Sequence, residues 1–132
     1  MAALLLVTHG KVGEVMLAMA VETIGKSPLP ALCLAVELDD NPSELLVKAR
    51  QMAHEFHGQD IIVLTDLFGS TPSNIAARLL REYDNMIMIA GLNIPMLIRL
   101  LNYADQETSV LVDKAVNGGR DGIFVYEPES DD

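Results

Sequence analysis

The sequence is poor in cysteine, in aromatic residues and in positive charge. It has one cysteine and no tryptophan, so no disulfide can form within the chain. Nine lysine and arginine residues stand against 19 aspartate and glutamate residues, which gives a formal net charge of −10. Such a charge disfavours sequence-independent binding to nucleic acid or to anionic lipid headgroups. We therefore expect no nucleic-acid partner.

Long hydrophobic runs are also lacking, although half of the residues are apolar. No stretch reaches the roughly 18 apolar residues of a membrane helix. The apolar N-terminal run is too short for a signal peptide, and no basic residue precedes it. The single cysteine, Cys33, lies in an apolar run and is interpreted as a core residue. These features predict a protein kept in a reducing cytoplasm.

The length of 132 residues predicts one compact domain, which we expect to span residues 1–126. The last six residues, 127–132, contain four carboxylates and are expected to form an acidic tail. Because the sequence stops there, we expect no further domain to follow.

Short apolar runs alternate with helical patterns along the chain. Strands are predicted at residues 4–7, 32–38, 61–65, 86–89 and 123–126. Helices are predicted between them, and the last helix, near 107–116, is expected to stop at Asn117-Gly118-Gly119. This alternation predicts an α/β fold, a doubly wound and mostly parallel sheet with helices on both faces.

Two chemically interesting side chains follow buried strands. His9 lies at the carboxyl end of the first predicted strand, and Asp66 follows the third. Ligands of open α/β sheets bind beyond the carboxyl ends of the strands, where the first and third strands of small doubly wound sheets are neighbours. We therefore expect an imidazole and a carboxylate to meet there, with Asn93 reaching the same edge after the fourth strand.

An imidazole beside a carboxylate can act as a general base, a metal ligand or a nucleophile. A hydrolase would use Ser70 or Thr71, but their surroundings differ from the Gly-x-Ser-x-Gly elbow. A metal site lacks ligands, because His54 and His57 are predicted at a solvated helix end on the opposite edge. No metal or cofactor is therefore expected. A further alternative stays open: Thr8-His9-Gly10 is only a turn, Asp66 is only a cap before a helix, and neither takes part in chemistry.

Nucleophilic attack by His9 on phosphorus fits the predicted surroundings best. A carboxylate that accepts one ring N–H leaves the lone pair of the other nitrogen free. The helix that opens at Pro72, with the hydroxyls of Ser70 and Thr71, would supply neutral donors for phosphoryl oxygens. ATP is not the expected donor, because the sequence has neither a Walker A loop nor Gly-x-Gly-x-x-Gly.

Four segments carry a more specific signal. They are Leu-Val-Thr-His-Gly at 6–10, Leu-Thr-Asp-Leu-Phe-Gly-Ser-Thr-Pro-Ser-Asn at 64–74, Ala-Gly-Leu-Asn-Ile-Pro-Met at 90–96 and Gly-Arg-Asp-Gly at 119–122. Together they resemble the mannose-type enzyme IIA domain of the bacterial phosphoenolpyruvate sugar phosphotransferase system. The resemblance implies a parallel sheet with one antiparallel edge strand at the C-terminus, here 123–126, and a homodimer that in some members exchanges this strand.

The resemblance also implies a function and site residues. The phosphocarrier HPr would pass a phosphoryl group to His9, which would hand it to an enzyme IIB protein and so to a sugar entering through a membrane permease. Asp66 corresponds to the carboxylate that orients the histidine, and Thr71 takes the place of a serine. The phosphoryl-binding residues implied in this way are Gly69, Ser70, Thr71 and Asn93.

One departure from the family pattern concerns the loop after Asp66. The family usually has Gly-Gly-Ser where this chain has Gly69-Ser70-Thr71, and a side chain at position 70 limits backbone freedom. The IIB acceptor is expected to be a separate polypeptide. Two alternatives stay open: a regulatory module whose phosphorylation state is read without sugar transport, and a phosphocarrier that serves dihydroxyacetone kinase.

Overall fold

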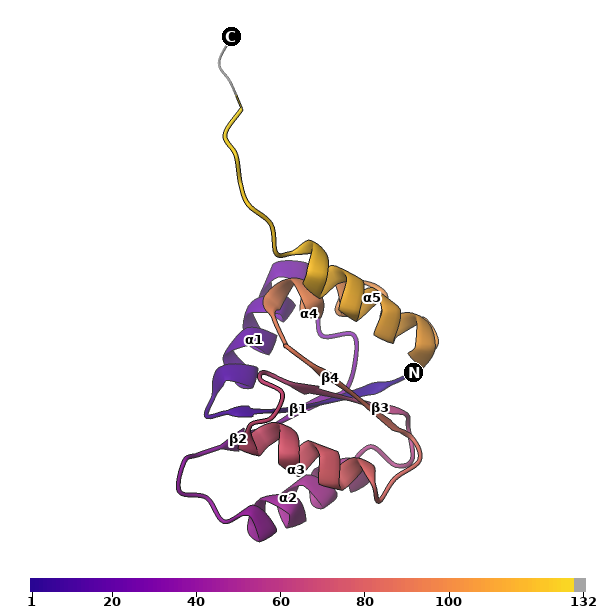
Figure 1. Ribbon diagram of the computed structural model, residues 1–132. Coiled ribbons are helices and arrows are strands. Elements are labelled where there is room, and N and C mark those ends of the chain that lie inside the picture. Colours follow the sequence, from indigo (N-terminus) through magenta and orange to yellow (C-terminus); the bar gives the residue numbers. More distant parts are fainter. Residues whose placement is uncertain (130–132) are drawn as a thin grey trace.

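Four parallel strands form the centre of the molecule, in the order β2-β1-β3-β4 (Figure 1). The computed structural model describes residues 1–129. The strands are β1 (Ala3–His9), β2 (Ala31–Val36), β3 (Ile61–Thr65) and β4 (Met86–Ala90). In the register, Val7 of β1 lies opposite Thr65 of β3, so the two strands end side by side. The predicted parallel sheet, with the first and third strands as neighbours, is confirmed.

Five helices cover the two faces of this sheet. They are α1 (Val12–Ile24), α2 (Pro42–His54), α3 (Thr71–Leu80), α4 (Ile94–Asn102) and α5 (Thr108–Asp121). Figure 1 shows α1, α4 and α5 on one face and α2 and α3 on the other. Helices α1 and α3 both begin at the edge toward which β1 runs. The predicted placement of helices on both faces is therefore confirmed.

The strands feed two hydrophobic cores. Side chains alternate along a strand, so Leu4 and Leu6 of β1 join the core under α1, α4 and α5, while Leu5 and Val7 join the core under α2 and α3. All four side chains are fully buried. Burial on both faces explains why the central strands are continuous apolar runs in the sequence.

The predicted end of the last helix at Asn117-Gly118-Gly119 is wrong, because α5 continues to Asp121. A Cβ added to Gly118 would lie 2.4 Å from Cβ of Arg99, and one added to Gly119 would lie 3.1 Å from Cε of Met96. These glycines let α5 pack closely against α4. Their role is helix packing, which a sequence pattern cannot distinguish from a helix stop.

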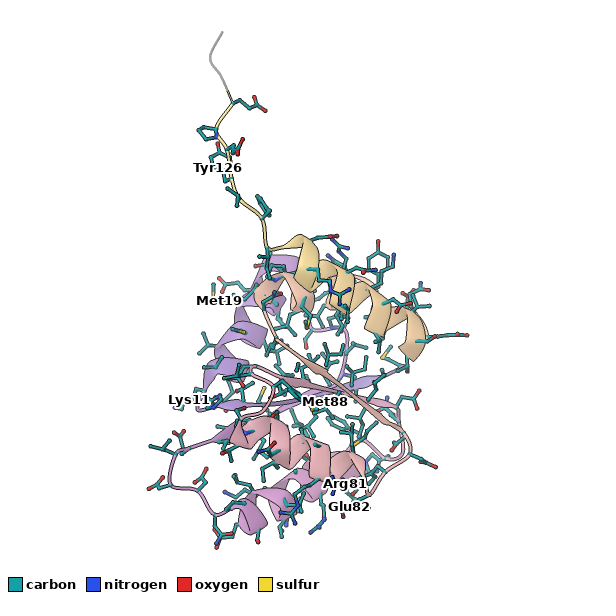
Figure 2. All side chains as sticks on the ribbon, viewed as in Figure 1. Lys11, Met19, Arg81, Glu82, Met88 and Tyr126 are labelled. Carbon is teal, nitrogen blue, oxygen red and sulfur yellow. The ribbon has the colours of Figure 1, made fainter. Side chains whose placement is uncertain are left out.

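The predicted strand at residues 123–126 is not formed in the single chain. This segment leaves the end of α5 and runs away from the body (Figure 1), and Figure 2 shows Tyr126 far from the sheet. Its four apolar side chains are each at least 75% exposed. A strand needs a hydrogen-bonding neighbour, and within residues 1–129 no sheet edge pairs with the segment. Residues 130–132 of the expected acidic tail lie outside the described residues.

Within residues 1–129, none of the helices has the length and apolar character needed to cross a membrane.

Candidate functional site

His9 and Asp66 meet at the carboxyl edge of the sheet. His9 is the last residue of β1, and Asp66 directly follows β3. Oδ2 of Asp66 lies 2.9 Å from Nδ1 of His9 and also accepts the backbone N–H of His9 at 3.1 Å. The His9 side chain is 48% exposed and that of Asp66 is 15% exposed. The structure thus joins the predicted pair and leaves the imidazole accessible to another molecule.

The carboxylate fixes which ring nitrogen is free. Burial by itself would raise the pKa of Asp66, but hydrogen bonds from the ring and the backbone N–H of His9 outweigh it, and the pKa is lowered. An ionised carboxylate only accepts hydrogen bonds, so Nδ1 of His9 carries the proton that it donates to Asp66. The lone pair of a neutral ring is therefore on Nε2, the ring nitrogen that does not contact the carboxylate.

Thr8 stabilises the turn after His9. Its buried hydroxyl accepts the N–H of Gly13 at 2.8 Å. A Cβ on Gly13 would lie 2.9 Å from that hydroxyl oxygen, so a larger residue would disturb the contact. Gly10 has a φ of 48° and donates its N–H to the carbonyl of Val36. Neither Thr8 nor Gly13 was predicted as a site residue, although a polar residue at the end of an apolar strand was a usable signal for Thr8.

The loop between β3 and α3 is closed by its own hydrogen bonds. Leu67 donates its N–H to Oδ1 of Asp66 at 3.1 Å. The Ser70 hydroxyl donates to the carbonyl of Leu67. Gly69 has a φ of 88° and donates its N–H to the hydroxyl of Ser73 at 2.8 Å. The donors of Gly69 and Ser70, expected to bind a phosphoryl group, are thus used inside the loop.

The first turn of α3 has further donors at this edge. Pro72 has no N–H, and Asn74 donates its N–H to the carbonyl of Ser70. Among the described residues, nothing accepts from the N–H of Thr71, the hydroxyl of Thr71 or the N–H of Ser73. Free donors at a helix N-terminus favour an anion. Thr71 therefore keeps the donor capacity that its expected role requires.

Asn93 caps α4. Its Oδ1 accepts the N–H of Met96 at 2.9 Å, and its Nδ2 donates to the carbonyl of Gly119 in α5 at 3.0 Å. Both polar groups of the side chain therefore join α4 to α5. Phosphoryl binding by this amide stays a prediction, and it would use the second N–H of Nδ2.

The other reactive side chains lie apart from this site. His54 ends α2, and both His54 and His57 are exposed, as expected for a solvated helix end. Cys33 is half-buried against the core, and burial together with the charge of Glu14 raises the pKa of its thiol to about 11. It is therefore a protonated packing residue at neutral pH. In residues 1–129, no three His, Cys, Asp or Glu side chains are grouped to hold a metal ion.

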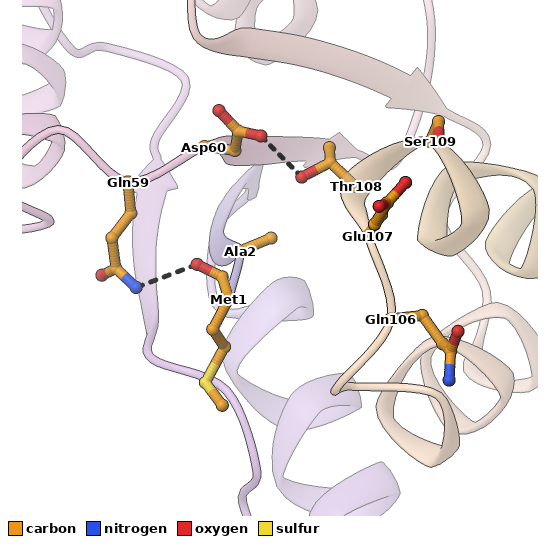
Figure 3. Close-up of a pocket in the computed structure, with 8 residues that line it drawn as sticks. All are labelled: Met1, Ala2, Gln59, Asp60, Gln106, Glu107, Thr108 and Ser109. Atoms are coloured by element: carbon orange, nitrogen blue, oxygen red, sulfur yellow. Dashed lines mark hydrogen bonds between the residues drawn. The ribbon is translucent and has the colours of Figure 1, made fainter.

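A polar cavity of about 580 Å³ lies at the opposite, amino edge of the sheet (Figure 3). There the Thr108 hydroxyl donates to Asp60 at 2.8 Å, and Gln59 donates to the carbonyl of Met1 at 3.0 Å. Neither His9 nor Asp66 lines it. The cavity is therefore separate from the histidine site.

Comparisons with known proteins identify the family. The family model EIIA-man, described as "PTS system fructose IIA component", matches residues 3–116. The mannose-specific EIIAB component of the phosphotransferase system (PTS) from Escherichia coli K12 is 32% identical over 124 residues. That match covers 92% of this chain and 38% of the relative, so the chain spans well under half of the relative's length. The fructose-specific EIIA component of Bacillus subtilis is 42% identical over 43 residues, which are 33% of this chain and 30% of that protein.

Solved structures show the same fold. The mannose/sorbose specific IIA subunit from Enterococcus faecalis superposes with a TM-score of 0.88 at 24% identity, and covers 98% of this chain and 97% of its own. EIIA from Streptococcus agalactiae gives a TM-score of 0.82 at 25% identity, with 95% and 97% covered. Because the family model matches most of the sequence, the chain belongs to the EIIA-man family of phosphotransferase-system IIA components.

Proposed function

We propose that this chain is a phosphoryl carrier of the sugar phosphotransferase system. His9 accepts a phosphoryl group from phospho-HPr and passes it to an enzyme IIB protein for sugar uptake through a membrane permease. In this proposal residues 1–126 act as one IIA domain in the cytoplasm. The observation that carries it is the contact between Asp66 and Nδ1 of the exposed His9.

The transfer step follows from this contact. The lone pair on Nε2 of His9 attacks the phosphorus atom, and a P–N bond forms. The bond from phosphorus to the phosphorylated histidine of HPr breaks, and the nitrogen of that histidine keeps the electron pair. The ring of His9 becomes positively charged, and the ionised Asp66 stabilises this charge through Nδ1–H. Transfer to the IIB protein is the same exchange in reverse.

Donors at the N-terminus of α3 would bind the phosphoryl oxygens. The hydroxyl and N–H of Thr71 and the N–H of Ser73 have no acceptor among the described residues. The N-terminus of a helix attracts anions through its free N–H groups and its dipole, so the site needs no net positive charge. This supports phosphoryl binding at Thr71, with Gly69 and Ser70 shaping the loop.

The surface around His9 suits docking of a protein. Apolar side chains are exposed on both sides of it, on α1 and in the loop after β3; they are Val12, Val15, Leu67 and Phe68. Exposed acidic residues follow β2 at the same edge, and the Glu37 carboxylate lies beside Gly10. An apolar patch with an acidic border fits a partner that has an apolar centre and basic residues around it.

We also propose a homodimer in which residues 123–126 pair with β4 of a second copy as an antiparallel edge strand. The apolar side chains of this segment are each at least 75% exposed. Strand β4 is at one edge of the sheet. Between β4 and α5 lies a groove of about 380 Å³, lined in part by Met88, Val112 and Val116. Exchange of the segment would cover both surfaces.

The phosphocarrier proposal is tested with purified phosphoenolpyruvate, enzyme I and HPr. We expect the protein to gain one acid-labile phosphoryl group, and His9→Ala to gain none because, among residues 1–129, no other histidine is paired with a carboxylate. His54→Ala is the matched control, since it removes an exposed histidine on the opposite edge, and it should be labelled like the parent. A phosphoryl group gained by His9→Ala would contradict the proposal. A labelled protein that transfers to no IIB partner would instead favour a regulatory module.

A further inference from the structure

Ser73 is a buried hydroxyl in the first turn of α3. Its side chain belongs to a residue only 2% exposed, and both hydrogen-bonding roles of the hydroxyl are used. Oγ accepts the N–H of Gly69 at 2.8 Å and donates to the carbonyl of Ser70 at 3.0 Å. One side chain of the helix therefore holds both ends of the Gly69-Ser70 dipeptide.

These two hydrogen bonds stabilise a part of the loop that the N-cap of α3 does not stabilise. Ser70 is the N-cap of α3, but its side chain makes no capping bond, since its hydroxyl donates to Leu67 instead. Gly69 needs a positive φ of 88°, and a Cβ built there would contact nothing within 4 Å. The space on the Cβ side of Gly69 is therefore open. The bond from its N–H to Ser73 and the bond from Ser73 to the next carbonyl, that of Ser70, hold the dipeptide.

A continuous series of hydrogen bonds leads from Ser73 to the imidazole. Ser73 donates to the Ser70 carbonyl, and the Ser70 hydroxyl donates to the Leu67 carbonyl. The N–H of Leu67 then donates to Oδ1 of Asp66, whose Oδ2 accepts from His9. The loop thus holds one carboxylate oxygen and His9 holds the other. Movement of the loop would rotate the carboxylate away from Nδ1.

We infer that Ser73 is a positioning residue for phosphoryl transfer at His9. Its hydroxyl fixes the loop that orients Asp66, and Asp66 fixes the ring. It also withholds the Gly69 N–H from the phosphoryl group, so that binding falls to the donors of Thr71 and of Ser73 itself. The inference about transfer rests on the proposed function, whereas the inference about the ring does not.

The test compares Ser73→Ala with Ser73→Thr, which keeps a hydroxyl. For Ser73→Ala we expect kcat for acceptance from phospho-HPr to fall about tenfold. A misplacement of about 1 Å can cost ~100-fold, and we expect the carboxylate to move by less than that. KM should change less than kcat, since Val12 and Val15 of the docking surface lie on α1, outside the loop, and KM reports binding where chemistry is slow. Ser73→Thr should restore most of the rate.

A second measurement needs no partner protein. Nitrogen NMR of the His9 ring should show the Nδ1–H tautomer dominant in the parent and a mixture of tautomers in Ser73→Ala. Ser43→Ala is the matched control, because Ser43 follows Pro42 in the first turn of α2 as Ser73 follows Pro72 in α3. It should leave rate and tautomer unchanged. If the parent accepts no phosphoryl group, the proposed function fails while the ring measurement still decides the inference.

Unchanged kcat and tautomer in folded Ser73→Ala would overturn the inference, even if its melting temperature fell. Should Ser73→Thr not fold, Ser70→Ala provides an independent test. It removes the bond from the Ser70 hydroxyl to Leu67, the next link toward Asp66. The same loss of kcat and the same tautomer mixture would support the inference, and a parent-like Ser70→Ala would contradict it.

Discussion

At the scale of single residues, the carboxylate of Asp66 has a distinct partner at each oxygen. Oδ1 accepts the N–H of Leu67, and Oδ2 accepts from the ring and the backbone of His9. These bonds lower the pKa of Asp66 despite its burial. A side chain that has the shape of the carboxylate but can donate a hydrogen bond to the ring would therefore test whether Asp66 orients His9 or only packs against it.

Asp66→Asn is the substitution that does this. We expect the fold to persist and the rate of phosphoryl transfer to fall about 10- to 100-fold, the usual effect of losing a partner that orients a reactive histidine. An amide NH₂ facing Nδ1 favours the wrong tautomer, and a neutral group no longer stabilises the charged ring. Stopped-flow transfer from phospho-HPr measures the rate, and circular dichroism checks the fold. A folded variant with the parental rate would show that the carboxylate does not orient the ring.

At the scale of elements, α4 and α5 pack closely against each other. Asn93 bonds to both helices, and Gly118 and Gly119 let them approach closely. In an isolated helix, alanine would be about 1 kcal/mol more favourable than glycine. In this pair of helices the added methyl group has no space.

We therefore expect Gly118→Ala to destabilise the protein. Its Cβ would lie 2.4 Å from Cβ of Arg99, and forcing an extra carbon into a packed contact costs about 1–3 kcal/mol, which outweighs the gain in helix propensity. Urea denaturation measures the free energy of unfolding. Asn117→Ala, on the exposed side of the same turn, is the control and should be neutral or stabilising. Equal stabilisation by both substitutions would refute the close-packing role.

At the scale of the whole molecule, the segment 123–126 is the one part of the described chain that carries four consecutive exposed apolar residues away from the body. A surface of this kind normally becomes buried against another molecule. The open edge of β4 and the adjacent groove offer a site for it on a second copy.

Phe124→Glu tests this arrangement. Burial of a charge in the groove is unfavourable, so we expect the dimer to dissociate at protein concentrations where the parent stays dimeric. Sedimentation velocity measures the oligomeric state. Leu38→Glu alters an exposed apolar residue in the loop after β2 and should stay dimeric. A monomeric parent, or a dimer unaffected by Phe124→Glu, would exclude the proposed exchange.

The parts of the fold that follow local rules were predictable. Apolar runs near residues 4–7 and 61–65 predicted buried strands, and both are found. Parallel strands bring their carboxyl ends to one edge, so His9 and Asp66 could be placed together before any contact was known. The two glycines of α5 wrongly predict a helix stop, because a helix stop and a close helix contact both place glycine in the sequence.

The sequence by itself determined the order of strands and helices, the family motifs and the two residues that face each other at the sheet edge, because spacing along the chain encodes them. Only the tertiary structure decided which donors are free. The amide of Asn93 donates to Gly119, 26 residues away along the chain, and this partner depends on how α4 and α5 pack. The hydroxyl of Ser73 binds Gly69 and Ser70, and these bonds depend on the path of the loop before α3. The extended course of 123–126 was decided in the same way, since a strand forms only where a neighbouring edge can accept its hydrogen bonds.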